Sequence, residues 1–286
     1  MPLPLAARKS IRDNEEHLTN AVETIKSALG VEWTFEFDFE TLLAKVESAD
    51  YVKNDPGSFF YKDVATNVAE CVKSFATKDE MVKEALIEAN ANSKVIVRVN
   101  EDKKNTSYWK YIFENNNLVL LFRASPANIS DITYFDLPSI IPSPGVLSLK
   151  ARLNLKENGE KFQTALEEIK EATKNDWTYD ESSIETCYTT FDFDKDRIGD
   201  IFAEIITNIA YNIKTRCKDE MILEAFNEVN TNNKIVFRHL PKQSDYWTFA
   251  FTSGDLIVSY KSICNVSDIE QEFSSIHTIK NQSAIN

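Results

Sequence analysis

Glycine and histidine are scarce in this chain of 286 residues, which has only six glycines and three histidines. Phosphate-binding loops need glycine for close backbone approach, and no glycine-rich loop of that kind is present. A Gly-x-Ser-x-Gly nucleophile elbow and a His-Glu-x-x-His zinc helix are also missing. His17, His239 and His277 lie far apart in the sequence, and we interpret them as solvated or capping side chains rather than a catalytic or metal-binding set. No catalytic signature can be read from these motifs, and no cofactor is expected.

Cysteine is also infrequent, and its four residues are not paired by spacing. Cys71, Cys187, Cys217 and Cys264 include no Cys-x-x-Cys motif, so a zinc site of that type is not expected. They do not recur at matching places in the two halves of the chain, so we interpret them as four separate thiols in a reducing, cytoplasmic compartment. Secretion is the alternative if the four Asn-x-Ser sequons are used. These sequons begin at Asn105, Asn128, Asn265 and Asn281.

Positive charge and long apolar runs are lacking as well. The formal net charge is −13, which repels phosphate backbones and anionic lipid headgroups, so nucleic acid is not an expected partner. No apolar run approaches the roughly 18 residues of a membrane helix, so we expect no association with a membrane. The first nine residues do not resemble a secretory signal. The composition, 43% hydrophobic and 27% charged, is typical of a soluble globular protein.

The clearest positive feature is an internal repeat. Of the 22 positions in residues 77–98, 11 are identical in residues 217–238. Matches continue to Ser130 and Ser267, while the offset between the halves falls by only three residues, from 140 to 137. Self-similarity over this length indicates a duplicated structural unit.

The hydrophobic patterns predict an α+β fold made of two tandem homologous repeats. We expect repeat 1 in residues 1–136, a proline-containing linker in residues 137–150, and repeat 2 in residues 151–286. Each repeat is predicted as helix, strand, two helices, a meander of three strands and a closing helix. The prediction is a four-stranded antiparallel sheet with helices on one face of it. Thr77 and Glu80 fit a capping box at the start of the third helix, with Cys217 in the place of Thr77 in the second copy.

The second face of each predicted sheet is too apolar for open water. It carries Ile96 and Ile112 in the first repeat, Val236 and Ile257 in the second, and Tyr108 and Tyr246 at matching positions. We therefore predict that the repeats form an internal pseudo-dimer through these faces or through a shared sheet. If a ligand binds there, these six residues are the candidate site, with the two tyrosine hydroxyls orienting it.

One acidic run offers a weaker alternative. Asp192, Asp194 and Asp196 alternate as the first ligands of a calcium loop do. The pattern then breaks, because Arg197 stands where the loop needs glycine and Ala203 where it needs a bidentate carboxylate. We favour a solvated turn before a helix.

Two functional hypotheses remain. The first is a non-catalytic binding or structural protein that holds an apolar small molecule or a protein partner at its sheet faces, because the halves share core and capping residues rather than a polar constellation. The second is an enzyme with a carboxylate-based acid and base site between the repeats. The oligomeric state is not predicted.

Overall fold

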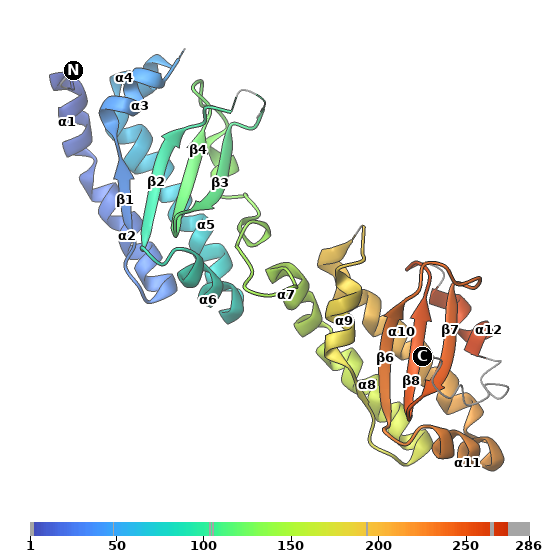
Figure 1. Ribbon diagram of the computed structural model, residues 1–286. Coiled ribbons are helices and arrows are strands. Elements are labelled where there is room, and N and C mark those ends of the chain that lie inside the picture. The colour runs from blue at the N-terminus through green and yellow to red at the C-terminus, as the bar shows by residue number, and fades with distance from the viewer. Residues whose placement is uncertain are drawn as a thin grey trace. The chain divides into compact units, whose positions relative to one another are not determined.

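The structure, a computed structural model, describes residues 3–47, 49–102, 104, 106–192, 194–263 and 266–273. The chain divides into two compact units, Met1–Pro144 and Gly145–Asn286. The predicted linker contains a 3₁₀ turn, and the helix α7 begins before the predicted linker ends. Each unit is an α+β structure with its own four-stranded sheet (Figure 1).

Unit 1 begins with two helices that lie along one side of its sheet (Figure 1). It ends with a β-hairpin that is followed by two short 3₁₀ turns. Its elements are α1 (Leu5–Asp13), α2 (Glu15–Leu29), β1 (Thr34–Phe37), α3 (Phe39–Lys45), α4 (Asp50–Asn54), η1 (Ser58–Ala65), α5 (Thr66–Ala76), α6 (Glu80–Ala89), β2 (Lys94–Val99), β3 (Trp109–Glu114), β4 (Asn117–Phe122), η2 (Ile129–Ile132) and η3 (Leu137–Ser139).

Unit 2 repeats this plan. Its elements are α7 (Leu149–Glu157), α8 (Gly159–Thr173), β5 (Thr178–Tyr179), α9 (Glu181–Tyr188), η4 (Lys195–Arg197), α10 (Ile198–Arg216), α11 (Glu220–Val229), β6 (Lys234–His239), β7 (Trp247–Thr252), β8 (Asp255–Tyr260), η5 (Val266–Asp268) and α12 (Ile269–Phe273). The strand order is β1-β2-β4-β3 in unit 1 and β5-β6-β8-β7 in unit 2, so the two sheets have the same topology.

The sheets are mixed and mostly parallel, so the prediction of antiparallel sheets was wrong. In unit 1, β2 is parallel to both β1 and β4, and only the β3–β4 hairpin is antiparallel. The predicted meander fails because β4 lies between β2 and β3. Alternation of side chains reports which face a residue occupies, but it carries no information on strand direction or neighbours. Residues 100–108 are long enough to pass from the end of β2 to the far edge of the sheet.

One face of each sheet packs on helices and forms the core. In unit 1, Phe60 of η1 contacts Phe37 and Phe122 at ring-centroid distances of 5.8 Å each. In unit 2, Phe202 of α10 contacts Phe237 of β6 at 4.6 Å. The helices α2 and α5 cover this face in unit 1 (Figure 1). Alternate strand residues such as Val95 and Val97 are buried there, which is the reason for the period-two pattern in the sequence.

The helix after the loop at residues 77–79 is capped by an aspartate, so the predicted capping box was wrong. Asp79 accepts a hydrogen bond from the Met81 amide at 2.8 Å, and Asp219 does the same for Met221 at 2.9 Å. The Thr77 hydroxyl instead donates to the Lys73 carbonyl at 2.8 Å, at the end of the preceding helix. Both copies therefore have the same capping residue.

Two glycines mark matching helix contacts in the two units. A Cβ added to Gly57 would lie 2.1 Å from the Ser10 carbonyl oxygen, and one added to Gly199 would lie 2.2 Å from that of Asn154. No larger residue fits at either position, because the obstacle is main chain. Beyond this contact the units differ, since η1 in unit 1 is a π-helix whereas α10 is a continuous α-helix.

A one-residue insertion explains this difference. Thr66 follows Gly57 by nine residues, but its counterpart Thr207 follows Gly199 by only eight. At one end the two glycines touch equivalent main-chain carbonyls, and at the other end α5 packs on α2 and α10 packs on α8. The additional residue must therefore be accommodated between these points. A π-helix has more residues per turn than an α-helix and absorbs it without rotating the rest of α5.

Candidate functional site

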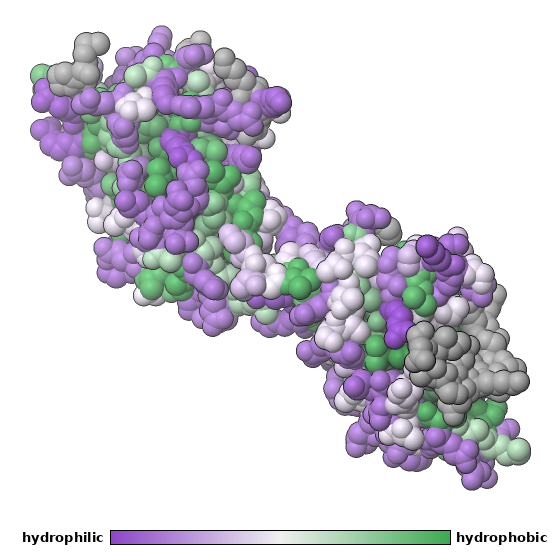
Figure 2. Space-filling model, in the orientation of Figure 1, coloured by the Kyte–Doolittle hydropathy of each residue, from purple (hydrophilic) through white to green (hydrophobic). Residues whose placement is uncertain are grey.

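The sheet face of unit 1 that faces away from α2 and α5 is the candidate site, which we call the open face. It is crossed by a row of apolar side chains, because Ile96 pairs with Val119 and Val119 pairs with Ile112. None of the described helices of unit 1 lies over this row (Figure 1). Figure 2 shows apolar atoms beside polar ones over these strands. The open face is therefore less buried than the core and more apolar than an ordinary solvent-exposed surface.

An ion pair protects the middle of this row. The Arg98 Nη2 atom lies 2.7 Å from the Glu114 Oε2 atom, and both side chains are a little over two-fifths exposed. Arg98 is two residues beyond Ile96 on β2, and Glu114 is two beyond Ile112 on the antiparallel β3, so the pair joins opposite sides of the row. Val119 between them is fully buried. The aliphatic stem of arginine is well suited to covering apolar surface in this way.

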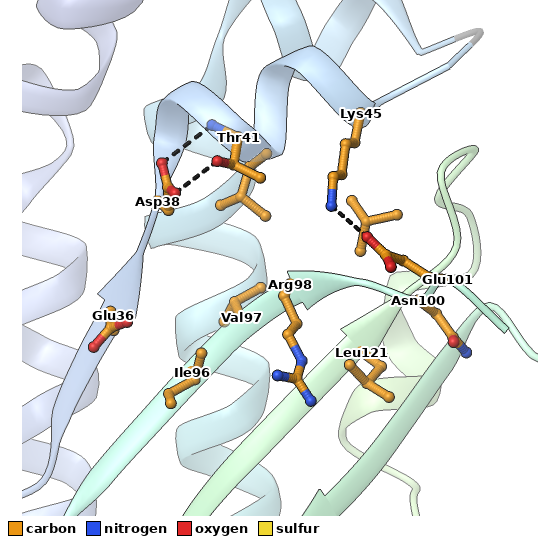
Figure 3. A pocket seen from close by; sticks show the side chains of 12 residues that line it. Glu36, Asp38, Thr41, Lys45, Ile96, Val97, Arg98, Asn100, Glu101 and Leu121 are labelled. Carbon is orange, nitrogen blue, oxygen red and sulfur yellow. Dashed lines mark hydrogen bonds and ion pairs between the residues drawn. The ribbon is translucent and has the colours of Figure 1, made fainter.

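A cavity of about 630 Å³ lies between this face and α3 (Figure 3). Ile96 and Leu121 lie on the sheet below it (Figure 3), and Leu42 of α3 also lines it. The charged residues of its lining are Glu36, Asp38, Lys45, Arg98 and Glu101. Its volume falls in the range of small-molecule sites, and its combination of an apolar floor with a few polar groups is typical of them.

The charges of the cavity are already paired. Lys45 forms an ion pair with Glu101, which lowers the pKa of the Glu101 carboxyl (Figure 3). Asp38 accepts a hydrogen bond from the Thr41 hydroxyl at 2.6 Å and another from the Thr41 amide at 3.1 Å, and these contacts lower its pKa (Figure 3). Both shifts favour the ionised carboxylate. A general acid acting near neutral pH needs the opposite shift, so these two groups suit binding better than acid catalysis.

The length of the first strand explains why this cavity belongs to unit 1. β1 has four residues and pairs with β2 as far as Phe37 and Val97, whereas β5 has only two. In unit 2 the helix α9 therefore starts earlier along the sheet. Its Ser183 hydroxyl accepts a hydrogen bond from the Phe237 amide of β6 at 3.0 Å. The longer β1 carries α3 past this position and leaves the space open.

In each unit, the apolar pair and the tyrosine of the predicted ligand site lie in separate regions of the sheet. Ile96 and Ile112 share a row in unit 1, and Val236 and Ile257 share the equivalent row in unit 2. Within each unit the two apolar residues therefore lie on one face of the sheet, and their role as a ligand site stays a prediction.

The two tyrosines lie elsewhere. Tyr108 precedes β3 by one residue and stands four residues from Ile112, which is roughly 13 Å along the strand. Its ring lies 5.3 Å from the guanidinium carbon of Arg123. Tyr246 has the same place before β7 and is 41% exposed. Neither lines the cavity on the open face.

Sequence reasoning missed Arg98 and the α3 side chains. Arg98 and Arg238 end matching strands, a position where an arginine commonly covers a sheet edge or meets a carboxylate. β2 is in fact an inner strand, so its arginine extends over the face of the sheet. The ion-pair partner on β3 is the distinguishing signal, since Glu114 corresponds to Thr252 in the second repeat.

The acidic run of unit 2 does not converge. Asp194 is exposed with a φ of 50°, and Asp196 accepts a hydrogen bond from the Ser148 hydroxyl at 2.9 Å. No group of three or more His, Cys, Asp or Glu among the described residues, including Asp192, is arranged to hold a metal ion.

The cysteines and sequons are only partly described. Cys71, Cys187 and Cys217 are buried free thiols. Asn128 is exposed, whereas Cys264, Asn105, Asn265 and Asn281 lie outside the described residues, as does His277. Within the described part of the chain, no helix has the length and apolar character needed to cross a membrane.

No protein-family model, curated protein sequence or solved structure matches this chain.

Proposed function

We propose that the protein is a non-catalytic binding protein, and that unit 1 holds a small molecule in the cavity between α3 and the open face. The observation that carries this proposal is the cavity of about 630 Å³, whose floor is apolar and whose polar groups come from two separate segments, residues 36–45 and 98–101. Its carboxyls Asp38 and Glu101 are held in the ionised form, which supports binding over proton transfer.

The ligand that fits best has an apolar body and a carboxylate. Ile96, Leu42 and Leu121 would contact the body. Arg98 would bind the carboxylate, because it already holds that of Glu114 at 2.7 Å. The existing pair is partly exposed to solvent, so exchanging Glu114 for a ligand carboxylate has only a small energetic cost.

Three probes with the same six-carbon chain test this proposal: hexanoate, hexanol and hexylammonium. Each would be titrated into isotope-labelled full-length protein and followed by NMR. Hexanoate should bind most tightly and shift the resonances of Ile96 and Leu121. Replacing Arg98 by methionine keeps the length of the side chain and removes its charge, so Arg98→Met should weaken hexanoate binding about tenfold.

Arg238→Met is the matched control, because Arg238 occupies the same position in the second sheet. It should leave the affinity for hexanoate unchanged. Equal losses in the two variants, or tighter binding of hexylammonium than of hexanoate, would refute the role of Arg98.

We also propose that the units descend from one duplicated domain. The shared sheet order, the aspartate caps and the Gly57 and Gly199 contacts support this. The internal pseudo-dimer and an acid and base site between the repeats stay predictions. Residues 1–144 expressed alone should self-associate if the pseudo-dimer exists, whereas a well-behaved monomer in analytical ultracentrifugation would rule it out.

A further inference from the structure

A second, smaller pocket of about 170 Å³ lies in unit 1, away from the open face. Three aromatic residues, Tyr51 of α4, Phe59 of η1 and Trp109 of β3, line it together with Asp63 of η1 and the loop at residues 127–129. The ring centroids of Tyr51 and Phe59 are 5.8 Å apart, and those of Phe59 and Trp109 are 6.3 Å apart. We call this the aromatic pocket.

The polar atoms of two of these rings are engaged elsewhere. The Tyr51 hydroxyl donates to the Pro126 carbonyl at 2.8 Å, and the Trp109 Nε1 atom donates to the Ala127 carbonyl at 2.7 Å. These bonds fix both rings against the loop that follows β4. The rings therefore offer apolar and π surface to a ligand rather than hydrogen-bonding groups.

Asp63 lies where unit 1 has one residue more than unit 2. Reading from the glycines, exposed Lys62 matches exposed Glu204, and reading back from the threonines, buried Val64 matches buried Ile205. Read back from the threonines, Asp63 also falls on Glu204, and the carbonyls of both accept a hydrogen bond from the matching asparagines, Asn67 and Asn208. The additional residue that the π-helix accommodates therefore lies at residues 62–63, and Asp63 is part of this segment. π-Helical insertions occur frequently at functional sites, and this one places a carboxylate beside three aromatic rings.

The Asp63 carboxylate has no partner in the part of the chain that the structure describes. Among the described residues it accepts no hydrogen bond and forms no ion pair, although its main-chain carbonyl accepts the Asn67 side chain at 2.7 Å. Partial burial raises its pKa, which Lys62 and His17 lower and Asp55 raises to smaller extents. A carboxylate that has lost water without gaining a partner favours an incoming cation.

We propose that the aromatic pocket binds a trimethylammonium head group. Such a group is a weakly hydrated cation that is attracted to the faces of aromatic rings, and a nearby carboxylate adds direct charge attraction. The volume of about 170 Å³ suits a single head group and is smaller than a typical drug-sized site. The net charge of −13 favours the approach of cations.

Other cations fit the lining less well. A divalent metal ion needs several oxygen ligands, and the described lining has only one carboxylate. A primary ammonium group is strongly hydrated and needs several acceptors, which aromatic walls do not provide. Methylation removes these donors and makes the cation compatible with the pocket.

Choline and its neutral carbon analogue, in which a tert-butyl group replaces the trimethylammonium group, test the proposal. They have nearly the same shape, so a difference in affinity reports the charge. Calorimetric titration of the full-length protein should show saturable choline binding, and the neutral analogue should bind at least about tenfold more weakly. A peptide with trimethyllysine identifies the source of the group: tighter binding than choline indicates a modified protein side chain, and weaker binding indicates a free small molecule.

Two variants locate the binding. Asp63→Asn keeps the shape of the side chain and should weaken choline binding about tenfold, whereas Glu204→Gln removes one exposed carboxylate from unit 2 and should have no effect. Circular dichroism would confirm that both variants are folded. Absent choline binding, equal affinity for the neutral analogue, or equal effects of the two substitutions would each overturn the proposal.

Discussion

Deleting Asp63 should leave unit 1 folded, although a deletion inside a helix is normally severe. The π-helix that holds the additional residue lies between two fixed points, the contact of Gly57 with Ser10 and the packing of α5 on α2. Removing Asp63 restores the eight-residue spacing that unit 2 has between Gly199 and Thr207. The segment should then become a continuous α-helix like α10.

The expected magnitude follows from which side chains move. The buried side chains on the two sides of the deleted residue keep their places: Phe60 and Tyr61 on its N-terminal side and Val64 on its C-terminal side. They do so because the additional π-helical turn disappears with the residue. The Asn67 side chain would then donate to the main-chain carbonyl of Lys62, just as the Asn208 side chain donates to that of Glu204 in unit 2. The free energy of unfolding should therefore change by no more than about 1 kcal/mol.

Deleting Glu204 is the matched control. It removes an exposed residue from a regular α-helix, so the residues on one side rotate by about 100° and shift by about 1.5 Å. Phe202 would lose its place against Phe237, and Gly199 would move away from Asn154. Each misplaced large apolar side chain costs about 3–5 kcal/mol, which is enough in combination to unfold a domain of ordinary stability.

Urea unfolding followed by far-UV circular dichroism would compare the two deletions. Hydrogen exchange with mass spectrometry on peptides from each unit would assign the loss of protection to unit 1 or unit 2, because a chain of two units need not unfold in one step. If the Asp63 deletion destabilises unit 1 as much as the Glu204 deletion destabilises unit 2, the insertion is not where we place it.

Three further outcomes can be checked directly. Asp79→Ala should destabilise unit 1 by about 1 kcal/mol in urea unfolding because it removes the cap, whereas Thr77→Ala should cost less; the reverse order would restore the capping box. Burial raises the pKa of Cys71 to about 12, so mass spectrometry should find it unalkylated by iodoacetamide near pH 8 until urea is added, and rapid labelling of the folded protein would contradict its burial. The Thr41 hydrogen bonds lower the pKa of Asp38 in the folded state, so its contribution to stability is present above its unfolded pKa and is lost as the pH falls through the folded pKa; the difference in melting temperature between wild type and Asp38→Ala should shrink below about pH 4, and a difference that persists would exclude the ionised cap.

The sequence alone determined the secondary structure of the conserved part of each repeat. Residues 94–99 alternate between the two faces of β2, and Leu18, Ala21 and Ile25 have the spacing of one face of α2. These patterns are local consequences of burying one face, so they can be read without knowing the neighbours. The duplication was equally visible because it is a property of the sequence itself.

Strand order and direction were decided by tertiary structure. A strand such as β4 shows the same alternation whether its neighbour is β2 or β3, and whether that neighbour runs parallel or antiparallel. The loop at residues 100–108 permits both arrangements. Packing of the whole sheet on its helices selects one of them, and that choice depends on contacts between distant segments.

The π-helix was determined partly by the sequence and partly by the tertiary structure. The spacings from Gly57 to Thr66 and from Gly199 to Thr207 differ by one residue in the sequence, but Asp55-Pro56-Gly57 has the composition of a turn rather than of a helix. Only the structure shows that both glycines touch a main-chain carbonyl. A one-residue difference has a structural meaning only when both ends of the segment are fixed, and those fixed points are tertiary contacts. For the same reason, the sequence contained Asp63 and the three aromatic residues, but the fold brought them to one pocket.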